Sequence, residues 1–190
     1  MATGDAEFWT TGSQPGADDP VVTWQEMLSA THLPWTVQIS PPEDARPFQA
    51  WVRRWWIDDL SLVDCACDPC SGLRQRHQLA DTVGEFVVVL INRSGRETVS
   101  QGGAEASLRP GDAVVWDSTA PARFRVWEPL SKRSLIVPRA ALEEVTGRGG
   151  EQHRGSAQRC RTCDPPALEL PRHPPGAAAG ARAGRDRGRP

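Results

Sequence analysis

The stretch that decides the fold is Glu85-Phe-Val-Val-Val-Leu-Ile-Asn-Arg-Ser-Gly95. Six apolar residues, three of them valine, are too few to cross a membrane. Such a run, rich in β-branched side chains, is typical of a strand that is buried on both faces. The polar Asn-Arg-Ser-Gly group then indicates a turn. The stretch therefore predicts a central strand of a β domain.

Shorter runs of β type lie on both sides of this strand. The Gly102-Gly103 pair predicts a tight hairpin, and Pro110-Gly111-Asp112 predicts a further turn. Short strands with turn signals every eight to twelve residues are typical of a sandwich or barrel. A short helix is expected at the N-terminal side, capped by Thr23 with Glu26 and ending near Ala30, and a short exit helix at 139–145. The expected strands are 48–57, 60–67, 73–77, 85–91, 98–101, 104–108, 113–117, 123–127 and 133–138.

The two ends of the chain differ from this middle part. Residues 1–20 are polar and acidic and predict a disordered leader, so the domain is expected over 21–147. Residues 148–190 are dominated by Gly, Ala, Arg and Pro and predict a disordered tail. The first 147 residues hold 13 basic and 20 acidic residues, whereas the tail holds 9 and 4. Two interpretations of the tail stay open: a natural basic arm, or GC-rich codons translated out of frame, which we favour.

Composition excludes several classes of protein. A net charge of −2 does not fit a protein that binds nucleic acid through its overall charge. No apolar stretch approaches the roughly 20 residues of a membrane span. The first 20 residues lack the basic and apolar regions of a secretion signal, so we expect a cytoplasmic protein with reduced thiols.

The β segments resemble, in their order, the cupin-like ligand-binding domain of AraC-type transcription regulators. Glu85 to Gly95 is similar to the buried strand and glycine turn of that family. The stretch from Thr98 to Asp112 is similar to its hairpin, and Val137-Pro-Arg to its last strand and exit helix. The resemblance covers about residues 21–145. It implies a mainly β, cupin-like (double-stranded β-helix) barrel that binds a small-molecule effector, with no cofactor.

One part of the family's architecture, its DNA-binding domain, has no counterpart in the sequence pattern. The family carries a DNA-binding domain of two helix-turn-helix units after the barrel, and residues 148–190 show no such pattern. The chain is thus interpreted as the sensory part of a truncated regulator that does not itself bind DNA. Family members pair through helices after the barrel, so a homodimer, or a mixed dimer with intact relatives, is the protein partner implied.

Candidate ligand residues come from the strands. Trp51, Trp55 and Trp116 are candidates for the apolar wall of a ligand cavity, although a place in the core is the simpler interpretation for most of the tryptophans. Trp51 and Trp55 should share one strand face. Arg74 and Arg76 should also share a face and could anchor a carboxylate, or simply face solvent. Arg123 and Arg125 should point outward.

Cysteine and histidine carry the alternative of a metal-dependent cupin enzyme. Cys65, Cys67 and Cys70 form a weak candidate metal or redox set, with Cys160 and Cys163 in the tail. The four histidines, His32, His77, His153 and His173, are scattered. A catalytic metal needs clustered ligands, so the sequence favours a binding protein without catalytic residues over an enzyme. A small-molecule-binding protein that stands alone, and an interaction protein with a disordered arm, stay as further alternatives.

Overall fold

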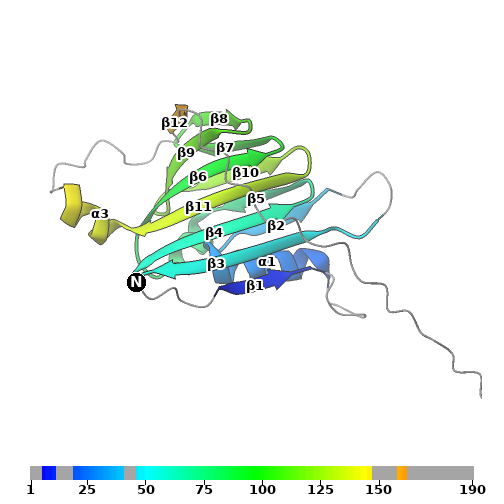
Figure 1. Ribbon diagram of the computed structural model, residues 1–190, viewed down its shortest axis with the longest axis horizontal. Coiled ribbons are helices and arrows are strands. Elements are labelled where there is room, and N and C mark those ends of the chain that lie inside the picture. Colours follow the sequence, from blue (N-terminus) through cyan, green and yellow to red (C-terminus); the bar gives the residue numbers. More distant parts are fainter. Residues whose placement is uncertain (1–5, 12–18, 41–45, 147–157, 162–190) are drawn as a thin grey trace, which may run out of the picture.

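The computed structural model of the chain describes residues 6–11, 19–40, 46–146 and 158–161. Two antiparallel sheets pack against each other and enclose one apolar core (Figure 1). Alternate residues of nearly every strand point into this core, which is the period-two pattern expected of a sheet with one buried face. The predicted mainly β architecture is therefore confirmed.

The predicted central strand is β6, which lies in the interior of the larger sheet between β11 and β9. Its neighbour β11 lies between β4 and β6, so the inward side chains of β11 are at the middle of this wall of the barrel. In spatial order the strands are β1 (Glu7–Thr10), β3 (Ala50–Ile57), β4 (Leu60–Cys67), β11 (Leu130–Pro138), β6 (Phe86–Ser94), β9 (Asp112–Asp117) and β12 (Gln158–Arg161).

The smaller sheet forms the opposite wall. Its β7–β8 hairpin turns at Gly102 and Gly103, whose φ angles of 59° and 80° both lie in the left-handed region that this turn requires. The predicted glycine hairpin is therefore confirmed. In spatial order the strands are β2 (Thr36–Ile39), β5 (Cys70–Arg74), β10 (Ala122–Val126), β7 (Glu97–Gln101) and β8 (Ala104–Leu108).

Helix α1 (Pro20–Thr31) lies beside β2 and β3 and buries Trp24 and Leu28 (Figure 1). It begins earlier than predicted. Asp19 caps it by accepting a hydrogen bond from the Val21 N–H at 2.8 Å, and Pro20 occupies the first turn, where a missing N–H costs nothing. The predicted cap at Thr23 is therefore wrong.

Two further corrections concern the predicted boundaries. The chain turns into helix α2 (Arg76–Ala80) directly after β5, so the strand expected through residue 77 ends at Arg74. The leader predicted as disordered contains β1, which pairs with β3. The exit helix is confirmed as α3 (Arg139–Thr146). In the C-terminal segment, β12 pairs with β9, and the rest of the predicted tail lies outside the described residues.

None of the helices within the described ranges is both long and apolar enough to cross a bilayer.

Candidate functional site

A buried ion pair spans the interior of the barrel. Along β11 the inward positions are Leu130, Lys132, Ser134 and Ile136, so a lysine stands among core residues. Lys132 is the single lysine of the chain. Its Nζ crosses from the larger sheet and donates a hydrogen bond of 2.8 Å to Oε2 of Glu97, which β7 supplies from the smaller sheet. The two sheets are thus joined by opposite charges at the centre of the core.

The charges of this pair support each other. Burial, the largest single influence, lowers the pKa of Lys132, but the Glu97 carboxylate together with the nearby Cys65 and Cys67 raises that pKa above its usual value. The ammonium group also lies 5.0 Å from the centroid of the Phe124 ring, within the range of a cation–π contact. Lys132 is therefore a charged group at neutral pH, surrounded by side chains that are mostly apolar.

His32, at the end of α1, brings a hydrogen-bond acceptor to the same interior. The Thr31 hydroxyl donates its one proton to the Met27 carbonyl at 2.6 Å, so it can only accept from Nδ1–H of His32, at 3.0 Å. Burial, followed by the charges of Lys132 and Arg54, lowers the pKa of His32 to about 3. The ring is neutral at pH 7, and its Nε2 carries a lone pair.

Lys132, His32 and Phe124 line a small cavity of about 30 Å³, close to the space of one water molecule. Its polar wall consists of Lys132, His32, Ser134 and the Cys67 thiol. Three polar atoms of residues that line the cavity, Trp24 Nε1, His32 Nε2 and Ser134 Oγ, have no hydrogen-bond partner among the described residues. The same holds for Oε1 of Glu97, the partner of Lys132. A buried polar atom without a partner is costly, so the arrangement suits a guest that supplies the missing hydrogen bonds.

Aromatic rings form the apolar wall of the cavity. Trp35 meets Trp116 and Phe124 edge to face, with ring centroids 5.5 Å and 5.0 Å apart. Phe124 lies so close to β5 that a Cβ on Gly72 would stand 2.2 Å from its Cε1 atom, so glycine at this position makes room for the ring. Trp24 covers the cavity from α1.

The predicted ligand residues have different positions in the structure. Trp116 lies in the cavity wall. Trp51 and Trp55 do share a face of β3, but it is the outer one: Trp51 is 37% exposed and stacks on Phe8 at 6.2 Å. Neither residue lines the interior cavity, and Trp51 instead lines a surface groove at the end of β3 and β4. The expectation that most of the tryptophans lie in the core is wrong: only Trp24, Trp35 and Trp116 of the eight are buried, and Trp56 and Trp127 are each 45% exposed.

The predicted pair of arginines does not form. Arg74 is completely buried and donates hydrogen bonds to the carbonyls of Pro34 at 2.9 Å and Ser118 at 3.1 Å, and burial lowers its pKa to about 10. Arg76 begins α2 and is exposed. Arg74 thus holds the loops together, and the two side chains share no face. Arg123 and Arg125 are exposed, as predicted.

The three central cysteines are buried and free. Cys65 and Cys67 share the inner face of β4 and point into the core, and the sulfur atoms of Cys67 and Cys70 are 3.9 Å apart. Within the described residues, no group of three His, Cys, Asp or Glu is arranged to hold a metal ion. Side chains of β12, which includes Cys160, are not described, and Cys163, His153 and His173 lie outside the described residues.

Sequence reasoning missed Lys132 and Glu97, and it did not assign His32 to the ligand site. One signal for Lys132 was present: a lone lysine in a chain with 21 arginines stands in a stretch whose neighbours alternate as a strand. No local signal marks Glu97, because the charged stretch Arg96-Glu97 follows a glycine turn and looks like the solvated start of a strand.

Comparisons with known proteins agree with this architecture. The model of the AraC-binding-like domain matches residues 24–183. The chain belongs to the AraC-binding-like domain family. The match to this AraC-binding-like domain continues past residue 147, where the sequence predicted the domain to end. Family membership and the β architecture together confirm the cupin-like fold.

Individual proteins are similar to this chain over part of their length. The AraC-like transcriptional activator CuxR superposes with a TM-score of 0.59 at 19% identity, covering 74% of this chain and 51% of CuxR. An uncharacterized protein in the nit 5′ region of Bacillus sp. (strain OxB-1) is 26% identical over 105 residues, which are 55% of this chain and 39% of that protein. A cupin_2 domain of an XRE family transcriptional regulator from Enterobacter cloacae superposes with a TM-score of 0.39 at 16% identity, over 46% and 95% of the two chains. The matched part of this chain therefore spans about half the length of CuxR and two fifths of that of the Bacillus protein.

Proposed function

We propose that this AraC-binding-like domain is the sensory part of a transcription regulator and binds a small polar effector inside its barrel. One observation carries the proposal: a buried Lys132–Glu97 pair next to a cavity whose wall holds polar atoms without partners. A buried ion pair contributes little net stability compared with well-packed apolar residues of the same volume. Its presence is therefore better accounted for by a ligand than by stability.

The chemistry of the wall limits the class of effector. Lys132 and Glu97 neutralise each other, so a neutral guest fits better than a strongly charged one. In the wall, His32 Nε2 needs a donor and Ser134 Oγ can donate and accept. Behind the wall, Oε1 of Glu97, the partner of Lys132, needs a donor as well. A compact molecule with several hydroxyl groups offers both, and its apolar faces would pack against Trp35 and Trp116.

Binding has to enlarge the cavity, because about 30 Å³ holds little more than one water molecule. Three of the residues around it, Trp24, Leu28 and His32, belong to α1 or follow it directly, so a small displacement of α1 is the simplest way to open it. We propose that this displacement is the signal that the effector generates.

The test is a thermal-shift screen of hydroxylated and carboxylated small molecules with the full chain. A guest at 100 times its Kd stabilises the fold by about 2.7 kcal/mol. We expect hits among neutral polyhydroxy compounds, a loss of their stabilisation in Ser134→Val, and no loss in Arg123→Ala, which changes an exposed residue of β10. Hits that Ser134→Val leaves unaffected would contradict the proposed site.

We further propose that the chain binds without catalysing a reaction and does not bind DNA by itself. Strands separate α1, α2 and α3 from one another, so consecutive helices of a helix-turn-helix do not occur among the described residues. Sequence-specific retardation of DNA in a gel by this chain would refute the proposal that it does not bind DNA.

The three reduced thiols suit a cytoplasmic regulator. Pairing with a second copy or an intact relative is tested by light scattering against the monomer mass of 20.8 kDa.

A further inference from the structure

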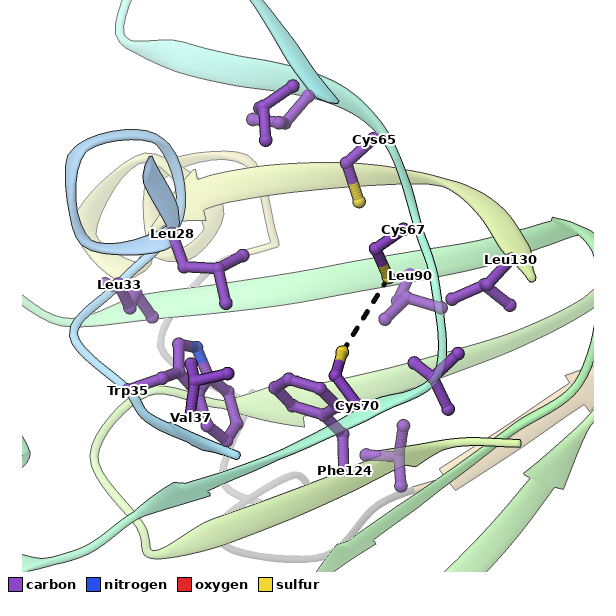
Figure 2. Close-up of a cluster of buried hydrophobic side chains, with 14 of the residues drawn as sticks. Leu28, Leu33, Trp35, Val37, Cys65, Cys67, Cys70, Leu90, Phe124 and Leu130 are labelled. Carbon is purple, nitrogen blue, oxygen red and sulfur yellow. Dashed lines mark hydrogen bonds between the residues drawn. The ribbon is translucent and has the colours of Figure 1, made fainter. Parts of the chain in front are cut away.

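Two cysteines face each other where the chain passes from one sheet to the other. Cys67 is the last residue of β4 and Cys70 the first of β5, and their sulfur atoms are 3.9 Å apart (Figure 2). The turn between them is fixed, because Asp68 accepts hydrogen bonds of 2.6 Å and 2.7 Å from Arg46 and one of 2.8 Å from the Gln49 N–H. The two thiols are therefore held near one another by the fold.

The surroundings make the two thiols unequal. The hydrogen bond from Cys67 lowers the pKa of Cys70, and the Lys132 ammonium and the Trp24 indole act in the same direction. That same hydrogen bond, together with burial, raises the pKa of Cys67. Cys65 is different again, because burial raises the pKa of its thiol to about 12. Of the three, Cys70 is the thiol whose anion the protein stabilises.

Cys67 connects this pair to the surface. It lines the interior cavity and also an open groove of about 510 Å³, whose other lining residues include Phe48, Asp68 and Leu130. Cys67 is thus the member of the pair that lies at the groove, with the Cys70 sulfur 3.9 Å from its own. A small oxidant that reaches Cys70 from the groove has to pass Cys67.

We propose that Cys67 and Cys70 form a redox-active dithiol that a hydroperoxide oxidises to a disulfide. The Cys70 thiolate attacks the peroxide, the O–O bond breaks, and the leaving hydroxide takes up a proton to become water. The Cys67 thiol then attacks the sulfenic acid at Cys70, which releases a second water as the S–S bond forms. In sum, two thiols and one hydrogen peroxide give one disulfide and two waters. Cys67 also lines the proposed effector cavity, but the oxidation itself requires no effector.

The first experiment uses the unaltered chain, treated with equimolar hydrogen peroxide and digested at aspartate without reduction. Cleavage before Asp64, Asp68 and Asp81 gives peptides 64–67 and 68–80. We expect the two to appear joined by a disulfide, with a mass about 2 Da below their sum. Separate peptides with free thiols, or irreversible over-oxidation without a link, would overturn the proposal. Stoichiometric zinc bound by the three thiols would overturn it as well.

Variants identify the partners. Cys65→Ser is the matched control, since it removes an equally buried thiol from the same strand and should leave the rate of disulfide formation within about twofold. Cys67→Ser should abolish the link and leave a sulfenic acid at Cys70 that a cyclic dione captures, while Cys70→Ser should abolish both products. A link that persists in Cys67→Ser, formed through Cys65, would contradict the assignment. Melting curves of all three variants report whether each one folds.

Discussion

Lys132 and Arg133 are neighbours on β11, yet they place two ion pairs in opposite environments. Lys132 points inward to Glu97, and the two side chains are 9% and 0% exposed. Arg133 points outward and grips Asp64 with two hydrogen bonds of 2.6 Å and 2.7 Å, with exposures of 32% and 7%. The hydrogen bonds of the two ion pairs have similar lengths. The pairs differ in the access of water to the cation.

Water decides what each pair contributes to stability. A partly hydrated pair costs little to form and contributes about 1 kcal/mol or less, because solvent screens it. The interior pair lost its hydration on folding, so each charge depends on the other for compensation. The comparison teaches that Arg133 and Asp64 can serve the fold, whereas Lys132 and Glu97 are better explained by binding.

The largest expected effect comes from breaking the interior pair. Glu97→Leu leaves the Lys132 ammonium buried without a counter-charge, and we expect a loss of about 3–5 kcal/mol in the free energy of unfolding. Denaturant unfolding of the full chain measures it.

A second variant separates charge from packing. Glu97→Leu combined with Lys132→Met removes both charges at similar volume, so most of the lost stability should return, while stabilisation by an effector should not. A double variant as unstable as the single one would mean that shape, rather than the unpaired charge, sets the cost.

The second largest effect should come from protonation of His32, which lowers the free energy of unfolding at acidic pH. Its folded pKa of about 3 lies below the usual 6.5, so the unfolded chain binds the extra proton between these values. The contribution is therefore complete above pH 6.5 and is lost as the pH falls toward 3, with an upper bound of about 4–5 kcal/mol. Between pH 7 and pH 4.5 the free energy of unfolding should fall with decreasing pH, and this dependence should disappear in His32→Gln. His77→Gln, which changes an exposed histidine of α2, should keep it.

The sequence predicted the β architecture well because its signals are local. An apolar run at Phe86, a glycine pair at Gly102 and a Pro-Gly-Asp turn each restrict the backbone within a few residues. The errors occurred where a distant contact decides the outcome. The chain leaves β5 at Arg74 because that guanidinium is anchored on carbonyls 40 and 44 residues away along the sequence. No local pattern contains this information.

The candidate site was predicted less well, for a related reason. Trp116 was found because a tryptophan in a strand is informative by itself. Lys132 and Glu97 are 35 residues apart, and each alone looks like a solvated residue of a strand. Alternation shows that residues share a face but does not show which face is inside, so Trp51 and Trp55 were assigned to the wrong side.

A methyl group can test how tightly the aromatic wall is packed. In Gly72→Ala the new Cβ would overlap Phe124, so the ring must move away from β5 at a cost of about 1–3 kcal/mol. Unfolding curves measure the loss, and Ser71→Ala, one position earlier on β5, is the matched control with an expected change within about 0.5 kcal/mol. An unchanged stability would mean that the cavity wall is soft and opens easily.

The smallest effect should come from the outer pair. Asp64 also lies 3.7 Å from Arg93, so Asp64→Asn removes the carboxylate from two arginines at once. Because both cations keep contact with water, we expect a loss of only about 1 kcal/mol, and less in high salt, where exposed charges are screened. Unfolding of Asp64→Asn and Glu97→Leu at low and high salt compares the two faces of β11 directly. If both variants lost the same stability, with the same dependence on salt, burial would not be what distinguishes the two pairs, and the argument that the interior pair exists for a ligand would lose its basis.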